Sequence, residues 1–437
     1  MANQQSLSGL AKFGDLKKRL LFLLGALIVF RIGAHIPVPG VDAAALAELY
    51  ESASSGMLGM LNMFSGGSLE RFSIFAIGIM PYISASIIVQ LASEILPSLK
   101  ALKKEGEAGR RIITKYTRYG TVVLAILQSF GVATFVFQQG VVVASQLEFY
   151  ISTVVCLVTG TMFLMWLGEQ MTERGVGNGI SLIITAGIAA GIPSGIAQLL
   201  TLTSQGSMSM LMAVAIVIGV LILIYAVVYF ESAQRKIPIH YAKRQVGNRL
   251  MQGQNTHMPF KLNMAGVIPP IFASSIILFP STLLSWFGSN NTDSWLYKIA
   301  GMLQHGQPVY ILLFAATIIF FCYFYTALVF SPREMAENLK KSGAFVPGIR
   351  PGEQTSRYLE KVVLRLTFFG ALYITIICLI PEFLTTALNV PFYLGGTSLL
   401  ILVVVTMDFS TQIASYRVTQ QYEHLMKRSD MKSLSRK

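Results

Sequence analysis

The chain alternates between long apolar stretches and shorter polar segments, and ten of the apolar stretches are long enough to form transmembrane helices. A helix needs roughly 20 predominantly apolar residues to cross the hydrocarbon core of a bilayer. The stretches lie near residues 20–36, 74–96, 119–137, 149–167, 180–200, 210–230, 265–287, 309–330, 366–380 with an extension, and 392–413. We therefore predict an all-α integral membrane protein with ten transmembrane helices.

The basic residues follow this pattern and predict its orientation. All but three of the 34 Lys and Arg residues lie in the N-terminal tail, in every second loop and in the C-terminal tail. The exceptions are Arg31, Arg71 and Lys298. Lys and Arg favour the cytoplasmic side of a membrane, and a miscounted span would break the alternation. The sequence therefore predicts ten spans with both termini in the cytoplasm.

The composition agrees with a lipid environment. The chain is 53% hydrophobic and 13% charged, whereas an ordinary soluble domain is about 25% charged. The net charge of +13 would suggest nucleic-acid binding in a soluble protein, but the loop positions of the basic residues assign it to membrane orientation. Cys156, Cys322 and Cys378 each lie in an apolar run without CxxC spacing, and no two histidines have metal-ligand spacing.

The sequence offers no motif for nucleotide binding or catalysis. It contains no GxxxxGK[ST], and residues 175–179 read GxGxG, not GxGxxG. An intramembrane enzyme would need a Ser/His pair, paired Asp or HExxH within the spans, and the sequence has none of these. We therefore predict no catalytic residue, no metal and no cofactor.

Few ionisable residues fall deep within the predicted spans. Arg31 lies toward the outer end of the first span, and Glu94 and Asp408 lie near inner ends. Ion-coupled transporters usually place acidic or histidine groups near the bilayer midplane. An ion-coupled secondary transporter is therefore the alternative function, and a midplane acidic site would favour it.

The outer segment at 38–73 contains an apolar piece that is too short to cross a bilayer. Met57 to Phe64 are mostly apolar, and Ser65-Gly66-Gly67-Ser68 follows. Such segments are usually re-entrant, interfacial or buried in protein, and the glycine pair permits a sharp turn. We predict a short helix within about 57–73 that folds back as a movable stopper; an ordinary interfacial loop is the alternative.

The second and seventh spans are the most polar and are interrupted by proline. Pro81 lies in the second, and Pro269 and Pro270 lie in the seventh. Each span is second within its half of the chain, taken as 1–205 and 206–437. Matched irregular helices suggest two inverted five-helix halves with a pathway between them, although the prolines could simply kink normally packed helices.

Two cytoplasmic loops are long enough to bind a partner. They cover 231–264 and 331–365 and mix charged residues with Gly and Pro. Ordered projecting loops of this kind commonly carry binding residues. We expect a partner to dock from the cytoplasm; the C-terminal tail at 416–437 carries six further basic residues.

Several separate motifs, read in order from about residue 16 to 415, resemble those of the SecY/Sec61-alpha family of protein-conducting channels. They are Phe30-Arg31-Ile32-Gly33, 62–67 (NMFSGG), 78–86 (GIMPYISAS), 103–107 (KKEGE), 166–170 (WLGEQ), 175–181 (GVGNGIS), 263–269 (NMAGVIP), 345–352 (FVPGIRPG) and 395–398 (GGTS).

The resemblance implies two pseudo-symmetric inverted five-helix halves around an hourglass pore with a short plug helix. An aliphatic ring would close its waist; the matching positions are Ile79, Ile83, Ile184, Ile271 and Ile401. The plug would contain Asn62, Met63, Phe64, Ser65, Gly66, Gly67 and Phe72. Its function would be to translocate unfolded preproteins and to insert membrane proteins.

The resemblance also implies a lateral gate and a docking surface. The gate would lie between the second and seventh spans, with Ser84, Gln90, Asn263, Ser274 and Phe279. The docking residues for the SecA motor and the ribosome would be Arg350, Arg249, Arg244, Lys340 and Lys341. Further implied partners are the SecE and SecG subunits, signal-sequence-bearing preproteins and membrane lipid, in the bacterial cytoplasmic (inner) membrane.

Overall fold

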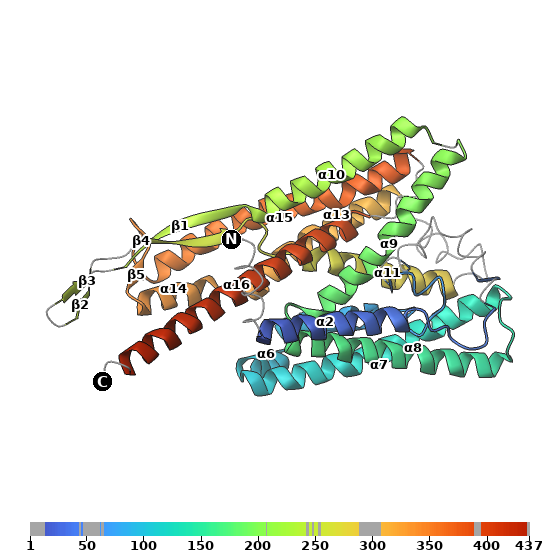
Figure 1. Ribbon diagram of the computed structural model, residues 1–437, viewed down its shortest axis with the longest axis horizontal. Coiled ribbons are helices and arrows are strands. Elements are labelled where there is room, and N and C mark those ends of the chain that lie inside the picture. The colour runs from blue at the N-terminus through green and yellow to red at the C-terminus, as the bar shows by residue number, and fades with distance from the viewer. Residues whose placement is uncertain are drawn as a thin grey trace. The chain divides into compact units, whose positions relative to one another are not determined.

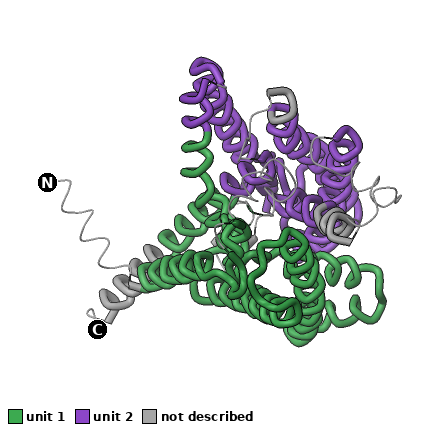
Figure 2. The backbone as a smooth tube through the Cα atoms, turned by 90° about the vertical axis from the view of Figure 1, so that its right-hand side faces the viewer, with its two compact units in different colours: residues 1–198, 278–304, 405–437 green, residues 199–277, 305–404 purple. Residues whose placement is uncertain are grey.

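The protein is described from a computed structural model. The structure describes residues 14–42, 45–46, 62, 65–206, 208–241, 244–246, 249–251, 255–287, 307–388 and 395–434, without the side chains of 244–246, 249–251, 278–287, 385–388 and 420–434. The chain divides into two compact units (Figure 2). Unit 1 comprises 1–198, 278–304 and 405–437, and unit 2 comprises 199–277 and 305–404.

Each of the ten predicted spans overlaps one long helix (Figure 1). The helices are α2 (Gly14–Gly33), α5 (Met80–Ile95), α7 (Glu107–Gln138), α8 (Gln146–Arg174), α9 (Gly179–Ser204), α10 (Met210–Ser232), α11 (Ile268–Phe287), α13 (Pro308–Val329), α15 (Glu353–Leu388) and α16 (Gly396–Leu434). By length and composition, 7 helices in the described residues could cross a membrane, or 8 if a bent pair forms one span. The mostly helical membrane fold is confirmed.

The bent pair consists of α5 and α6 (Pro97–Lys104), whose axes differ by 95°. The break falls at Leu96, because a residue before proline is pushed out of the α conformation. Across the bend, Glu94 pairs with Lys103 and, at 3.7 Å, with Lys100. The C-terminal end of α5 therefore forms a corner held by these ion pairs.

The N-terminal end of the same span differs from the prediction of 74–96. Residues 74–79 form turns, and α5 begins only at Met80. Gly78 has a φ of +64°, which ends the turns, and Pro81 lies in the first helical turn, where its missing N–H costs nothing. Hydropathy alone detects the apolar run but not this change of backbone conformation.

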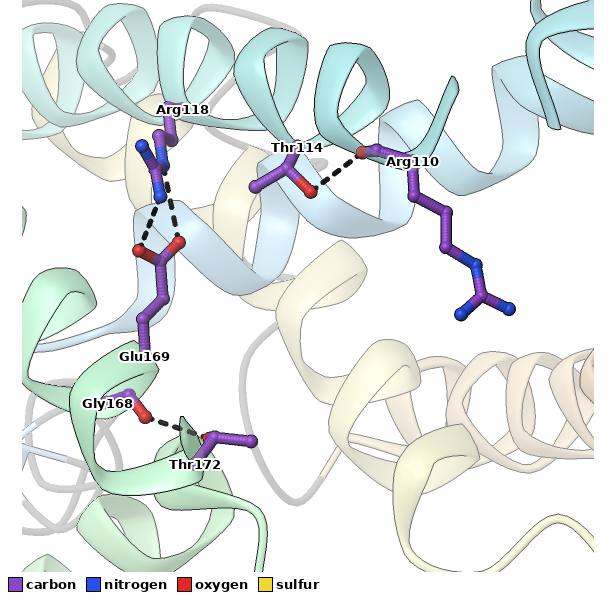
Figure 3. A network of polar contacts seen from close by, with 6 residues as sticks. All are labelled: Arg110, Thr114, Arg118, Gly168, Glu169 and Thr172. Atoms are coloured by element: carbon purple, nitrogen blue, oxygen red, sulfur yellow. Dashed lines mark hydrogen bonds and ion pairs between the residues drawn. The ribbon is translucent and has the colours of Figure 1, made fainter. Parts of the chain in front are cut away.

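In unit 1, α7 packs against α5 and α8. Arg118 on α7 donates two hydrogen bonds to Glu169 on α8, of 2.6 and 3.3 Å (Figure 3). Farther along the same two helices, a buried cluster includes Val132 on α7 and Phe149 and Leu157 on α8. These contacts pack α5, α7 and α8 against one another.

In unit 2, the loops at 231–264 and 331–365 form a single folded module, which is named the cytoplasmic module after the side of the membrane predicted for it. A three-stranded sheet has the order β4-β1-β5, with β1 (Gln234–Tyr241), β4 (Asn255–Lys261) and β5 (Ala344–Phe345). β2 (Arg244–Val246) and β3 (Arg249–Met251) pair as a separate hairpin. The sequence analysis predicted ordered loops here but no strands, although Ile237 and Ile239 alternate with exposed residues as in a half-buried strand.

The module has its own hydrophobic core beneath the sheet. Ile237, Phe260 and Val346 pack there against the first turns of α15, where Leu359 is fully buried. The short helix α14 (Pro332–Lys341) lies beside both β5 and α15. This core fixes the 331–365 loop to the 231–264 loop.

We predict that the Arg118–Glu169 bridge contributes about 1 kcal/mol to the stability of unit 1, because it is bidentate and Glu169 is only 19% exposed. R118A should lower the thermal unfolding temperature in detergent. R110A is the matched control, since Arg110 on the same helix is exposed. Equal losses in the two variants would contradict this role.

Candidate functional site

The five predicted ring positions are all buried. Ile79, Ile83 and Ile184 of unit 1 are 4%, 6% and 4% exposed, and Ile271 and Ile401 of unit 2 are 7% and 0% exposed. Ile79 precedes α5, and its carbonyl accepts the amide hydrogen of Ile83 at 3.1 Å, so these two lie one helical turn apart. The closure of all five into one ring stays a prediction.

The predicted plug segment is mostly a series of turns and not the short helix expected from the sequence. Asn62 and Ser65 are helical, but residues 66–72 are turns or a bend, so the predicted helix is wrong for this part. Gly66 and Gly67 have φ of +68° and +80°, which an α-helix cannot contain. Met63, Phe64 and residues 57–61 lie outside the described residues.

Polar contacts within this segment close the turns. The Asn62 amide donates to Glu70 Oε2 at 3.2 Å, and Asn62 Oδ1 accepts the Glu70 backbone N–H at 3.0 Å. The Ser65 hydroxyl donates to the Asn62 carbonyl at 3.0 Å and accepts the Leu69 N–H at 3.2 Å. Asn62 and Ser65 are both buried. Their side chains therefore replace bonds that a regular helix would supply.

Arg31 attaches the segment to α2. Its Nη1 donates to the Gly66 carbonyl at 3.1 Å, across a separation of 35 residues. An ionisable residue within a membrane span is costly unless it is paired, and it commonly has a functional role. The carbonyl of Gly66 thus accepts a hydrogen bond from the one charged side chain in the C-terminal half of α2.

The C-terminal end of the segment is anchored by backbone and aromatic contacts. The Val38 N–H donates to the Phe72 carbonyl at 2.9 Å, and the Ile74 N–H donates to the Ile36 carbonyl at 3.0 Å. Phe72 stacks on Phe149 with ring centroids 6.3 Å apart. Its φ of 44° is left-handed, which is rare for a bulky residue and requires such over-determined packing.

Close backbone packing explains one of the two plug glycines. A Cβ atom at Gly66 would lie 2.8 Å from the Cα of Gly187 on α9. No side chain larger than hydrogen fits there, and the positive φ adds to the cost. Gly67 has open space around it, so only its backbone conformation requires glycine.

The predicted gate residues are positioned by local hydrogen bonds. Ser84 and Gln90 on α5 are half-buried, and Gln90 donates to Ser86 at 3.2 Å. On α11, Ser274 is buried and donates to the Ile271 carbonyl at 2.9 Å. Asn263 is buried before the start of α11, and the side chain of Phe279 lies outside the described residues. A contact between the two helices stays a prediction.

The predicted docking residues lie on the cytoplasmic module. Lys340 and Lys341 are exposed at the C-terminal end of α14, where positive charge interacts favourably with the helix dipole. Arg350 is exposed in the turn before α15, and its carbonyl accepts the Thr355 hydroxyl at 2.9 Å. Arg244 and Arg249 belong to the β2–β3 hairpin, and their side chains are among those not described.

Two buried acidic residues were not predicted from the sequence: Glu231 and Glu382, which are 5% and 6% exposed. Both lie at the edges of apolar runs, Glu231 in the last turn of α10 and Glu382 directly after Pro381 in α15. Their position at the edge of a span looks like an ordinary end of a helix in the sequence. Glu231 accepts a hydrogen bond from Asn263 at 3.2 Å.

Comparisons with known proteins agree with one another. The sequence model of the SecY family matches residues 73–410. The chain is 58% identical to the protein translocase subunit SecY of Escherichia coli K12 over 443 residues, covering 100% of both chains. It is 58% identical to that of Vibrio cholerae over 427 residues, covering 97% of this chain and 96% of the relative.

Solved structures share the fold at low sequence identity. One, described as a protein conducting channel, has a TM-score of 0.67 at 18% identity and covers 93% of this chain and 94% of its own. Another is Sec61 in the canine ribosome-channel complex, with a TM-score of 0.65, 18% identity and the same coverage.

We predict that R31M loosens the segment at 65–73. A hydrogen bond to a charged group contributes roughly 1.5–3 kcal/mol, so amide hydrogen exchange there should accelerate by about tenfold or more. Mass spectrometry of the protein in nanodiscs measures this. R71M is the matched control, because Arg71 lies in the same segment but is exposed; the same acceleration in R71M would contradict a specific tether.

Proposed function

The chain belongs to the SecY family, and we propose that it conducts unfolded preproteins across the cytoplasmic membrane, and inserts membrane proteins into it, through a pore between its two halves. The halves are residues 1–205 and 206–437. The observation that carries the mechanism is the burial of all five aliphatic side chains that match the family's pore ring.

An aliphatic waist can block small solutes and still admit a polypeptide. A narrow apolar constriction excludes ions by dewetting and needs no charged gate. Dispersion contacts are weak individually and carry little chemical selectivity, so the ring adapts to whichever side chain passes. The proposed ring of Ile79, Ile83, Ile184, Ile271 and Ile401 therefore seals and yields by the same interaction.

The segment at 57–73 is proposed to act as the plug. The Arg31–Gly66 bond attaches its first described turn to α2, and an entering chain can replace this contact, while the bond from Val38 to the Phe72 carbonyl anchors its C-terminal end. A related solved structure is described as having a plug domain that stabilises the closed state of the channel. The left-handed Phe72 and its stacked partner Phe149 support a fixed hinge at the end of the segment.

The lateral gate is proposed to lie between α5 and α11. Ser84, Gln90, Asn263 and Ser274 would weaken its apolar closure, while Phe279 would contribute apolar contact. A signal sequence that binds there shifts the balance toward the open state only if it binds the open state more tightly. The helix of the bound signal sequence would be partly exposed to lipid, which supports the lateral release of membrane proteins into the bilayer.

The cytoplasmic module is proposed to bind SecA and the ribosome. Exposed Lys340, Lys341 and Arg350 support this, with Arg244 and Arg249 as further candidates. Energy for transport would come from these partners or from the membrane potential, and SecE and SecG would complete the complex. The matched canine Sec61 is described in a ribosome-channel complex. The N- and C-terminal tails would both face the cytoplasm.

We predict that a preprotein arrested during transport crosslinks to a photoreactive residue placed at Ile83. The chain should be reconstituted with SecE, SecG and SecA, and the adduct detected by electrophoresis. Ile88 on the same helix is the matched control, since it is 55% exposed and should face away from the pathway. Active transport with no adduct at Ile83 would refute the pore assignment.

We predict that R350A reduces SecA-driven transport by about tenfold or more, because an exposed arginine at the centre of an interface is a typical hot spot. Transport of a labelled preprotein into proteoliposomes measures this. R333A should stay within about twofold, because Arg333 is also exposed on the same loop and forms a weak surface ion pair with Glu337, one turn along its own helix. Normal transport by R350A would remove Arg350 from the docking surface.

A further inference from the structure

A buried polar pair lies where the cytoplasmic module meets the membrane helices of unit 2. Glu231, in the last turn of α10, is 5% exposed, and Asn263, just before α11, is 4% exposed. Asn263 Nδ2 donates to Glu231 Oε2 at 3.2 Å across 32 residues. A buried carboxylate is costly unless it accepts hydrogen bonds, so this contact constrains both residues.

Asn263 also determines how the chain enters α11. Its Nδ2 donates to the Gly266 carbonyl at 3.2 Å, and its Oδ1 accepts the Gly266 N–H at 3.0 Å. Gly266 has a φ of +64°, and the helix begins two residues later at Ile268. One side chain thus connects Glu231 to the turn that starts the proposed gate helix.

The same pair closes the base of a rigid hairpin. β1 begins three residues after Glu231, and β4 ends two residues before Asn263. The two strands pair in register from Gln234–Lys261 to His240–Asn255, and the Leu262 N–H donates to the Ala233 carbonyl at 3.0 Å below them. The ladder therefore continues almost to the Glu231–Asn263 contact without a flexible linker.

Neighbouring elements limit how else this base can move. A Cβ atom at Gly370 on α15 would lie 3.1 Å from the Leu262 carbonyl, so α15 packs closely behind it. β1 also pairs with β5, through His240–Phe345 and Tyr241–Ala344, on the loop that carries Arg350. A displacement of the docking loop therefore reaches the base of the hairpin through paired backbone.

We propose that the Glu231–Asn263 pair is a positioning contact that transmits partner docking from the β1–β4 hairpin to the first turn of α11. This inference rests on the proposed function, because it assumes that α11 belongs to the gate. The pair acts by fixing the turn at Gly266. When the Glu231–Asn263 contact shifts, the turn at Gly266 and the start of α11 shift with it.

The variants are chosen so that hydrogen bonding, charge and folding separate. E231A removes the acceptor for the Asn263 amide. N263D keeps the acceptor for the Gly266 N–H but places two carboxylates against each other, which is strongly unfavourable when buried. E231Q/N263D restores a donor–acceptor pair with the polarity reversed. E231Q alone can still accept from Asn263 and is the matched control.

The experiment compares amide hydrogen exchange with and without SecA bound to a non-hydrolysable ATP analogue, for the complete translocon in nanodiscs. In the wild-type protein, SecA should protect residues 234–261 and change exchange in residues 264–272 by about tenfold. E231A should keep the protection of the hairpin and lose the change in 264–272. N263D should lose it as well, and E231Q/N263D should regain it.

Each outcome decides the proposal. An unchanged response of 264–272 in E231A overturns it, and so does a wild-type protein that transports preprotein while 264–272 never responds; the channel function would survive both. Should E231A fail to fold, the comparison of N263D with E231Q/N263D decides, because a merely structural pair would recover folding without recovering the SecA-dependent change. Absence of transport in the wild-type protein would instead refute the proposed function.

Discussion

The requirement that every backbone polar group in a membrane find a partner within the protein governs this structure. The long helices meet it by themselves. The segment at 65–79 does not, because Gly66 and Gly67 break the helical pattern, and it combines backbone bonds within its turns with bonds from side chains. Asn62, Ser65 and Arg31 supply those bonds. A segment that relies on a few side chains for part of its hydrogen bonding can leave its place when those side chains find other partners, as the proposed plug requires.

Much of the fold could be predicted from hydropathy and charge. Ten apolar runs predict ten helices, and each prediction overlaps a helix. The functional assignment came from ordered motifs, and the match to the SecY family confirms it. The five ring positions rest on the family resemblance and stay a prediction, because a single buried isoleucine such as Ile401 gives no signal of its own in an apolar helix.

The misses have definite physical causes. Residues 74–79 are as apolar as the helix after them, so hydropathy cannot detect that Gly78 ends a series of turns. The strands β1 and β4 lie in a loop read mainly for its charge, although Ile237 and Ile239 alternate correctly. Glu231 looks like a polar residue at a helix end, and only the folded chain brings Asn263, 32 residues away, within 3.2 Å of it.

Because of the bend between α5 and α6, the short helix α6 projects sideways from the axis of α5. The eight residues of α6 extend about 12 Å at nearly a right angle to α5. Any rotation of α5 about its own axis is therefore magnified at the far end of α6, by about 2 Å for each 10°. Glu94 holds this bend through its ion pairs with Lys103 and Lys100. A spectroscopic label near Lys104 would therefore report the rotation of α5.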